Sequence, residues 1–279
     1  MSRAIAHAEG TAVPETVATR AVVTGAARGI GRAIAARLVA EGWEVVISDL
    51  DADELHRTAV ELGAHAVVAD VATDAGVGAL IDAAEARLGE VDAFFGNAGF
   101  ALMGGLDTPD SDWARILDVN LMAHVRAARR LVPSWAERGT GRFVVTASAA
   151  GLLTMLRDAP YSVTKHAAVA LVEWINATYR HRGVVAQAVC PQGVQTRLLD
   201  DSGPLADVLS RDSALTPEQV ADAVWRGLGS GEPLILPHPE VRDYYIRRAT
   251  DTDAWLRGMN KLEQKLESMT EPAPPEENQ

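Results

Sequence analysis

Short apolar runs alternate with amphipathic stretches along most of the chain, and this alternation predicts strands that are each followed by a helix. The runs that predict strands lie at 21–23, 45–47, 67–69, 91–95, 142–147, 184–189 and 234–236. The segments between them predict helices that start near Ile30 and Pro160 and helices over 75–88, 110–138 and 217–228. This order is typical of an α/β fold with one doubly wound, parallel sheet of about seven strands and helices on both faces.

No repeat or linker divides the chain, so residues 20–269 are expected to form a single domain. Residues 1–19 lack the apolar core of a signal peptide, which predicts a flexible N-terminal extension and a cytoplasmic protein. Residues 270–279 are acidic and rich in proline, which predicts a disordered tail. The stretch 192–215 has apolar residues among polar ones, as in segments that cover an active site.

A C-terminal helix is predicted by apolar positions that alternate spacings of four and three. These positions are Trp255, Met259, Leu262, Leu266 and Met269. The single apolar seam that they form is expected to be buried against the body of the protein or at a subunit interface.

Composition and charge narrow the classes of function. The 279 residues are 48% hydrophobic and carry a formal net charge of -12, from 38 acidic and 26 basic residues. A protein with this balance is not expected to bind nucleic acid, which needs clustered Lys and Arg. No apolar segment approaches the length of about 18 residues that spans a bilayer, so membrane association is not expected. The single cysteine, Cys190, ends an apolar run and is predicted to be a buried thiol in a reducing compartment.

A glycine-rich turn follows the first predicted strand: Thr24-Gly25-Ala26-Ala27-Arg28-Gly29-Ile30-Gly31. Glycines allow a sharp turn and a close approach of a ligand, and the following helix start offers unpaired N–H groups to a pyrophosphate. The spacing G-x-x-x-G-x-G differs from the general dinucleotide fingerprint, so the turn alone is a weak signal.

Polar residues also follow the next strands. Asp49 comes 18 residues after Gly31, where an acid can accept hydrogen bonds from the hydroxyls of an adenosine ribose; alternatively, it starts a loop or caps the next helix. Asp70-Val71 follows the third strand and Asn97-Ala98-Gly99 the fourth. Carboxyl ends of parallel strands are where ligands bind in doubly wound sheets.

A phenol and an ammonium lie four positions apart on the helix that Pro160 opens. Tyr161 and Lys165 therefore share one helix face, where the cation can stabilise a phenolate for acid/base chemistry. Such a pair also occurs by chance on ordinary helices. Ser148 follows the fifth strand, and Asn120 stands inside a predicted helix, where Asn is unfavourable unless its side chain has a task.

Together these motifs closely resemble the short-chain dehydrogenase/reductase superfamily. In chain order they are Thr24-Gly25-x-x-x-Gly29-x-Gly31, Asp49, Asp70, Asn97-Ala98-Gly99, Asn120, Ser148 and Tyr161-x-x-x-Lys165. The resemblance is strong over residues 21–199 and holds only in outline beyond them. It implies a single Rossmann-type domain, an NAD(P)-dependent alcohol dehydrogenase or ketoreductase, and a homotetramer or dimer. No metal site is expected.

The resemblance implies a role for each motif. The cofactor would contact the turn residues Gly25, Arg28, Gly29, Ile30 and Gly31, and also Asp70, Val71, Asn97, Ala98 and Gly99. Tyr161 would be the general acid/base, and Lys165 would hold the nicotinamide ribose and lower the Tyr161 pKa. Ser148 would hydrogen-bond the substrate oxygen. Asn120 would anchor a water that connects Lys165 to solvent.

The sequence departs from the family pattern after the sixth strand. Where the family has Pro-Gly-x-Val-x-Thr, this chain has Pro191-Gln192-Gly193-Val194-Gln195-Thr196, with Gln192 in place of the first glycine. The longer polar side chain is expected to reach the nicotinamide or the substrate. Pro191, Val194 and Thr196 are expected to contact the nicotinamide end of the cofactor.

Two residues point to different cofactors. Arg28 stands where some relatives bind the extra phosphate of NADP, whereas a ribose-binding Asp49 would repel that phosphate. We therefore expect NAD, with NADP as the alternative.

The expected substrate pocket is apolar, with Phe100, Leu153, Met155, Gln192 and Leu198 around it. It suggests a hydrophobic secondary alcohol or ketone as the small-molecule partner. The alternatives are an NADPH-dependent carbonyl reductase and a non-catalytic nucleotide-binding sensor or scaffold. The second alternative is disfavoured because Ser148, Tyr161 and Lys165 are all present.

Overall fold

The computed structural model describes residues 19–200 and 214–270. Within them, seven parallel strands form one sheet in the order β3-β2-β1-β4-β5-β6-β7. The strands are β1 (Arg20–Thr24), β2 (Glu44–Asp49), β3 (His65–Val68), β4 (Ala93–Gly96), β5 (Gly141–Thr146), β6 (Val184–Val189) and β7 (Leu234–Ile235). The predicted doubly wound sheet is confirmed. The order of the strands reverses between β1 and β4, because β1 to β3 extend toward one edge of the sheet and β4 to β7 toward the other.

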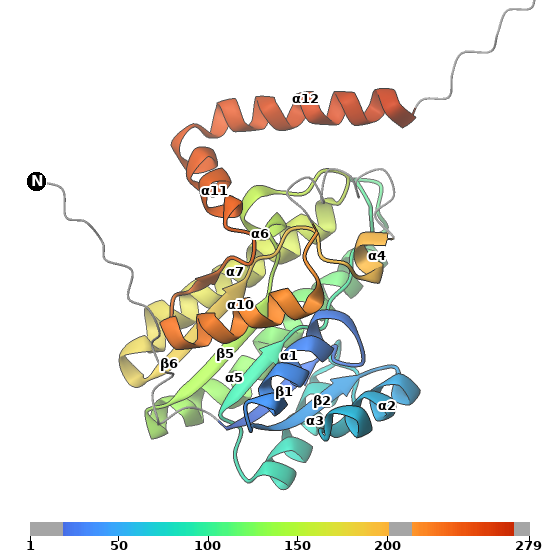
Figure 1. The fold of residues 1–279 in the computed structure, drawn as a ribbon. Coiled ribbons are helices and arrows are strands. Elements are labelled where there is room, and N and C mark those ends of the chain that lie inside the picture. Colours follow the sequence, from blue (N-terminus) through green and yellow to red (C-terminus); the bar gives the residue numbers. More distant parts are fainter. Residues whose placement is uncertain (1–18, 201–213, 271–279) are drawn as a thin grey trace, which may run out of the picture.

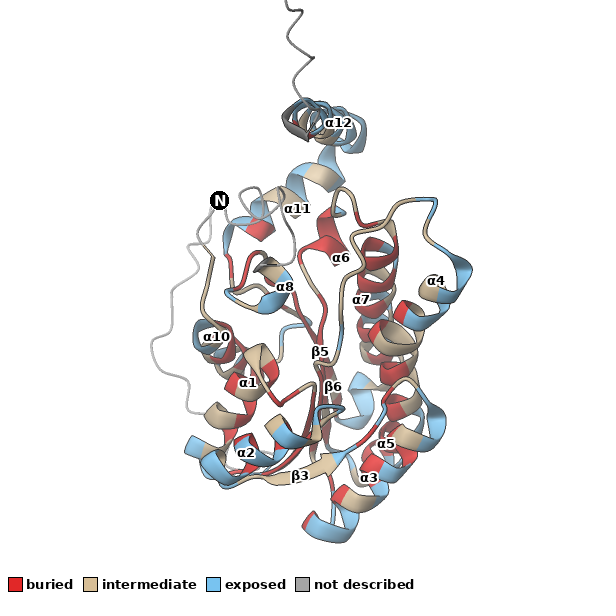
Figure 2. Cartoon of the chain, turned by 90° about the vertical axis from the view of Figure 1, so that its right-hand side faces the viewer, coloured by how far each residue is buried: buried red, intermediate tan, exposed pale blue. Residues whose placement is uncertain are grey.

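Helices cover both faces of the sheet (Figure 1). One face packs against α1 (Gly29–Ala40), α2 (Ala52–Leu62) and α10 (Pro217–Ser230), and the other against α3 (Asp74–Leu88), α5 (Ala123–Arg138) and α7 (Ala159–Tyr179). Figure 2 shows these two helix layers on either side of the buried strands. Shorter helices are α4 (Asp110–Leu117), α6 (Ala150–Leu153), α8 (Arg197–Asp200) and the 3-10 turn Arg180–Arg182.

The strands bury both of their faces, as parallel strands between helix layers must. In β4, Phe94 belongs to the core on the α3 and α5 side, and the next residue, Phe95, belongs to the core on the α1 side. Phe94 stacks on Phe143 of β5 with ring centroids 5.5 Å apart. The apolar runs of the sequence reflect this burial on two faces, which is why they show little polar alternation.

The boundaries of several elements differ from the prediction. β3 begins two residues earlier, at His65 rather than at residue 67. The expected helix over 110–138 is divided by a π-helical turn, Asp118–Met122. Part of the stretch 192–215 is ordered, because Val194 pairs with Leu215 in a parallel bridge. Residues 1–18, 201–213 and 271–279 lie outside the described residues, so the expected extension, tail and middle of that stretch are not described.

The C-terminal part forms two helices, α11 (Glu240–Thr250) and α12 (Thr252–Thr270). Figure 1 shows them beyond the body of the domain, above the carboxyl ends of the strands. Arg248 of α11 donates a hydrogen bond to the Leu152 carbonyl of α6 and so joins this helix pair to the body. Within the described ranges 19–200 and 214–270, every helix is too short or too polar to cross a membrane.

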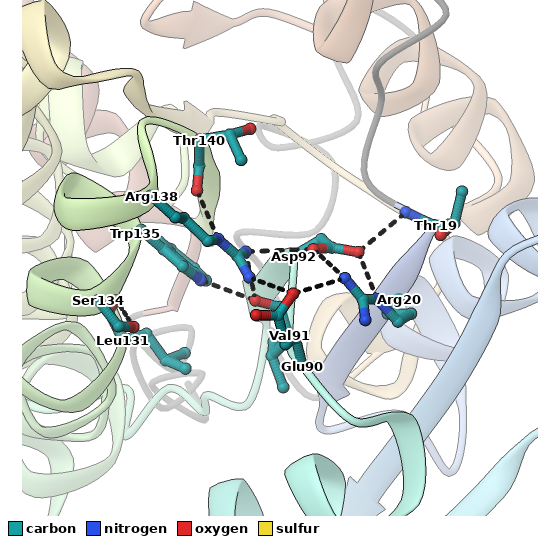
Figure 3. A network of polar contacts seen from close by, with 10 residues as sticks. All are labelled: Thr19, Arg20, Glu90, Val91, Asp92, Leu131, Ser134, Trp135, Arg138 and Thr140. Carbon is teal, nitrogen blue, oxygen red and sulfur yellow. Dashed lines mark hydrogen bonds and ion pairs between the residues drawn. The ribbon is translucent and has the colours of Figure 1, made fainter.

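A polar network closes the opposite end of the sheet, where β1 and β4 begin (Figure 3). Arg20 donates two hydrogen bonds to the Asp92 carboxylate, at 2.8 and 2.9 Å, and Arg138 donates a third at 3.1 Å. The Trp135 indole donates to the Val91 carbonyl at 2.7 Å. These contacts tie β1, β4 and the end of α5 together far from the ligand-binding edge.

We expect Asp92→Asn to lower the free energy of unfolding by about 2 kcal/mol at pH 7. Burial raises the pKa of Asp92, but the hydrogen bonds and charges of Arg20 and Arg138 outweigh burial and hold it below its usual value of 3.8. A depressed pKa in the folded state means that the stabilisation is present at neutral pH and lost as the pH falls through that pKa. Urea unfolding should therefore show a difference in unfolding free energy between the variant and the unmodified protein that is constant from pH 7 to about pH 5 and narrows below about pH 4.

The control is Glu90→Gln, because the Glu90 side chain meets the same two arginines but is 61% exposed. It should change the free energy of unfolding by less than about 0.5 kcal/mol. Equal losses of unfolding free energy in Asp92→Asn and Glu90→Gln would show that the buried Asp92 carboxylate contributes no more to stability than the exposed Glu90 carboxylate.

Candidate functional site

A cavity of about 1050 Å³ lies at the carboxyl ends of β1, β4, β5 and β6. It includes the point where the strand order reverses, which is where doubly wound sheets bind ligands. Its lining runs from the glycine-rich turn through the ends of the central strands to α11 and α12. The expected site residues that line it are Gly25, Arg28, Gly29, Ile30, Asn97, Gly99, Ser148, Leu153, Met155, Tyr161, Lys165, Pro191, Gln192, Val194, Thr196 and Leu198.

The glycine-rich turn fits the diphosphate of a dinucleotide. A Cβ on Gly31 would lie 2.3 Å from the Gly25 carbonyl oxygen, so the turn closes this tightly only without a side chain there. Gly25 has φ +62°, in the left-handed region, and a Cβ on it would lie 2.7 Å from Ala98 Cα. No side chain caps the N-terminus of α1, so its first N–H groups face the cavity as anion donors.

Asn97 joins this turn to the end of β4. Its side-chain amide donates to the carbonyls of Thr24 and Gly25, both at 3.1 Å. The backbone N–H groups of Asn97 and Ala98 donate to the Thr24 hydroxyl at 3.0 and 3.1 Å. Asn97 therefore fixes the position of the glycine-rich turn relative to the end of β4. Ala98 and Gly31 do not line the cavity themselves.

Asp49 ends β2 beside the same turn. One carboxylate oxygen accepts from the Ala27 N–H at 3.1 Å, and the other from the N–H groups of Leu50 and Asp51 at 2.8 and 3.2 Å. The cap of α2 is Asp51, which accepts from the Glu54 N–H, so Asp49 does not cap that helix. Arg28 forms an ion pair with Asp51 rather than with Asp49.

Ser148, Tyr161 and Lys165 come together at the centre of the cavity. The Ser148 side chain lies close enough to the Tyr161 hydroxyl to lower the pKa of the phenol. The Lys165 ammonium donates to the Thr146 carbonyl at 2.8 Å and lies 5.4 Å from the centre of the Tyr161 ring. Tyr161 and Lys165 are 7% and 3% exposed, so both polar groups are held away from bulk water.

Burial dominates the proton affinities of this pair. It raises the pKa of Tyr161 to about 12, although the neighbouring Ser148 side chain acts in the opposite direction and the nearby Asp158 adds to the increase. It lowers the pKa of Lys165 to about 8. The expected net lowering of the Tyr161 pKa is therefore not found in the protein alone, because both groups lose water and the ammonium donates to a carbonyl.

The π-helical turn explains the Asn in the middle of a helix. Asn120 is fully buried, and its side chain accepts from the Phe100 N–H at 3.0 Å and donates to the Phe100 carbonyl at 2.9 Å. Its amide also donates to the Thr164 hydroxyl of α7 at 3.3 Å. Asn120 thus links the loop after β4 to α7, a contact that the sequence did not indicate.

Asp158 is a buried carboxylate with two tasks. It caps α7 by accepting from the Tyr161 N–H at 2.9 Å. Its other oxygen accepts from the N–H groups of Leu102 and Met103 at 3.0 and 2.9 Å. One side chain thereby fixes both the start of the catalytic helix and the loop beside it.

The family model for short chain dehydrogenases matches residues 19–204 of this chain. The chain belongs to the short-chain dehydrogenase family. It is therefore an NAD(P)-dependent oxidoreductase with a Rossmann-type domain, and the resemblance seen in its motifs is confirmed.

Relatives and solved structures cover most of this short-chain dehydrogenase. A 1-deoxy-11-beta-hydroxypentalenate dehydrogenase from Streptomyces exfoliatus is 35% identical over 232 residues, which cover 80% of this chain and 84% of the relative. A 2-dehydro-3-deoxy-L-rhamnonate dehydrogenase (NAD(+)) from Sphingomonas sp. is 34% identical, over 64% of this chain and 74% of the relative. A short chain dehydrogenase/reductase from Burkholderia phymatum, solved in complex with NAD, has a TM-score of 0.78 at 30% identity, covering 85% of this chain and 94% of that one.

The substrate side of this short-chain dehydrogenase differs in part from the prediction. Phe100 does not line the cavity; its ring lies under the Arg115 guanidinium at 5.4 Å and packs with Ile116. Sequence reasoning missed one wall, formed by Tyr244, Ala254, Trp255, Gly258, Met259 and Leu262 of α11 and α12. The spacing of apolar residues in the sequence predicted the seam of α12, but it did not indicate that the seam faces the cavity that Ser148 and Tyr161 line.

Other expected residues lie outside the lining. Asp70 is exposed and accepts from the Ala72 N–H at 3.0 Å, and Val71 is buried in the core. Cys190 is fully buried as expected, and burial raises the pKa of its thiol to about 12. Across residues 19–200 and 214–270 of this short-chain dehydrogenase, no group of three or more His, Cys, Asp or Glu side chains is arranged to hold a metal ion.

Proposed function

We propose that this short-chain dehydrogenase interconverts a hydrophobic secondary alcohol and its ketone with NAD as the hydride carrier. The observation that carries the proposal is that Ser148, Tyr161 and Lys165 line the same cavity as the glycine-rich turn. The Streptomyces exfoliatus relative, which is named for the dehydrogenation of a hydroxy compound, supports this reaction class.

The residues suggest how the proton is handled. The Ser148 hydroxyl would donate to the substrate oxygen and stabilise the charge that develops on it. Tyr161, which lies beside Ser148 in the cavity, is placed to take the alcohol proton during oxidation or to return it during reduction. Bound nicotinamide would accept or supply the hydride, and its oxidised form brings a positive charge that favours the phenolate.

Lys165 is the cation that this step requires. Lys165 is 3% exposed and its ammonium lies 5.4 Å from the Tyr161 ring centre, so little water separates the ammonium from the phenol. Neighbouring positive charge is the factor that can bring a buried phenol down from a pKa of about 12 towards neutral pH. We therefore assign Lys165 to stabilising the phenolate and Tyr161 to moving the proton.

The arrangement around Asp49 favours NAD over NADP. Two carboxylates, Asp49 and Asp51, stand beside the turn, and a 2′-phosphate placed there would meet their negative charge. Arg28, the cation that could bind such a phosphate, is already paired with Asp51. The Sphingomonas relative carries NAD(+) in its name, and the Burkholderia phymatum structure contains NAD, which supports the same choice.

Steady-state kinetics test the proposal. The purified protein should oxidise cyclohexanol and 1-decalol, with kcat/KM at least about tenfold higher with NAD than with NADP. Asp49→Ala should lower kcat/KM for NAD about tenfold, because charged hydrogen bonds to the ribose are lost. The exposed Asp53→Ala on α2 is the matched control. A preference for NADP would overturn the cofactor assignment, and activity on polyols such as sorbitol alone would overturn the hydrophobic substrate.

A further inference from the structure

The cavity of this enzyme has an outer wall that does not belong to the sheet or to the helices packed on it. α12 follows α11 beyond the body of the domain, as Figure 1 shows. Trp255, Met259 and Leu262 of α12 nevertheless line the same cavity as Ser148 and Tyr161. The spacing of four and three places these side chains on one face of the helix.

The inner face of α12 is apolar, and the rest of the protein covers it only in part. Trp255, Met259 and Leu262 are only half-buried, although they point into the cavity lining rather than to the outside. The Trp255 indole N–H is shielded from water, and it has no hydrogen-bond partner among residues 19–200 and 214–270. An apolar ligand with a polar substituent would cover these side chains and could accept from the indole.

α12 is held in place by contacts with the body. Arg157, in the loop before α7, forms an ion pair with Glu263 of α12 at 2.9 Å, and both side chains are 26% exposed. The rings of Tyr244 on α11 and Trp255 on α12 lie 6.4 Å apart. Because Arg157 lies only four residues from Tyr161, the ion pair connects the wall directly to the catalytic end of α7.

We propose that α12 is the specificity-determining wall of the substrate pocket, and that it selects bulky, multi-ring alcohols over small ones. Its inner face packs on the part of the substrate far from the hydroxyl, and the Arg157–Glu263 ion pair holds it at the distance that a large substrate fills. This inference rests on the proposed dehydrogenase function and names the substrate class of the same site.

A pair of identical substitutions on α12 tests the wall. Leu262→Asp places a charge on the inner face, whereas Leu256→Asp places it on the outer face, where Leu256 is 54% exposed. With NAD, Leu262→Asp should lower kcat/KM for 1-decalol at least tenfold and leave cyclohexanol within about twofold, because only the larger alcohol reaches α12. Leu256→Asp should change neither. An equal loss for both alcohols in Leu262→Asp, or no loss, would overturn the proposal.

The ion pair is tested by charge reversal. Glu263→Arg should raise KM for 1-decalol about fivefold with little change in kcat, since it affects binding rather than chemistry. The double variant Arg157→Glu/Glu263→Arg should restore KM to within about twofold of the original value. Failure of the double variant to recover, although folded by circular dichroism, would show that the ion pair does not position the wall.

Failure of the dehydrogenase function can be told apart from failure of the wall. If the unmodified protein oxidised neither alcohol, the proposed dehydrogenase function would be refuted. The role of α12 in selecting bulky ligands would then be tested by ligand binding alone. 1-Decalone should raise the melting temperature of the NAD-bound unmodified protein and of Leu256→Asp but not of Leu262→Asp. Equal shifts in all three proteins would overturn the wall.

Discussion

Replacement of Tyr161 by phenylalanine should lower kcat about a thousandfold with every alcohol that the enzyme oxidises. The substitution removes the phenol hydroxyl that lies beside Ser148 in the cavity, and a positioned acid/base group contributes about 10² to 10⁴ in rate. The ring itself is retained, so packing with Ile116 and Ala150 should persist. Steady-state kinetics with saturating NAD measure the effect.

Tyr179→Phe is the matched control because it removes the same hydroxyl from the other end of α7. Tyr179 contacts the Trp174 ring at 5.9 Å and does not line the cavity. NAD affinity, followed by quenching of protein fluorescence, should be the same in both variants and in the unmodified protein. Turnover that survived in Tyr161→Phe would refute the assignment of the proton-transfer group.

Lys165→Met should lower kcat about a hundredfold while leaving the enzyme folded. Loss of the ammonium removes the positive charge beside the phenol, and the loss of one preorganised group that stabilises developing charge costs about 10² to 10³ in rate. The pH at which activity rises should also move upward, since the phenolate loses its cation. A pH profile of kcat/KM identical to that of the unmodified protein would contradict this role.

The same variant should be more stable than the unmodified protein. Burial lowers the pKa of Lys165 from 10.5 to about 8, so the folded state bears the cost of a buried charge at all pH values below about 8. Methionine removes that cost, and the free energy of unfolding should rise by about 2 kcal/mol at pH 7 even though the Thr146 carbonyl loses its donor. The stability of the unmodified protein should rise between pH 8 and 10, where the unfolded state binds the proton more tightly, and the variant should lack this rise. Urea unfolding at pH 7, 8 and 10 measures both effects.

Local sequence patterns predicted the sheet and many of the residues that line the cavity. Buried parallel strands appear as short apolar runs, and Tyr161 and Lys165 share a face because the spacing of four is a property of any α-helix. The glycine-rich turn could be recognised because its close contacts, such as Gly31 against Gly25, involve residues near in sequence.

The outer half of the site could not be predicted in the same way. Met259 and Leu262 meet the cavity about a hundred residues after Tyr161, and periodicity shows that a helix has an apolar face but not what lies opposite it. Phe100 was misplaced because its contact with Arg115 depends on the packing of α4. The direction in which the Tyr161 pKa shifts depends mainly on the burial of the phenol, and the spacing of residues in the sequence does not reveal that burial.

The bonds made by Asp158 have a consequence for how the substrate range of this enzyme can evolve. The carboxylate binds both the Tyr161 N–H and the loop at Leu102 and Met103, so a mutation that reshapes that loop also alters the bonds of the residue that caps α7. α12 is tied to this end of α7 through the ion pair between Arg157 and Glu263, and Glu263 is not part of the cavity lining. The inner face of α12 is therefore free to diverge, by drift or by laboratory selection, while the proton-transfer machinery keeps its geometry.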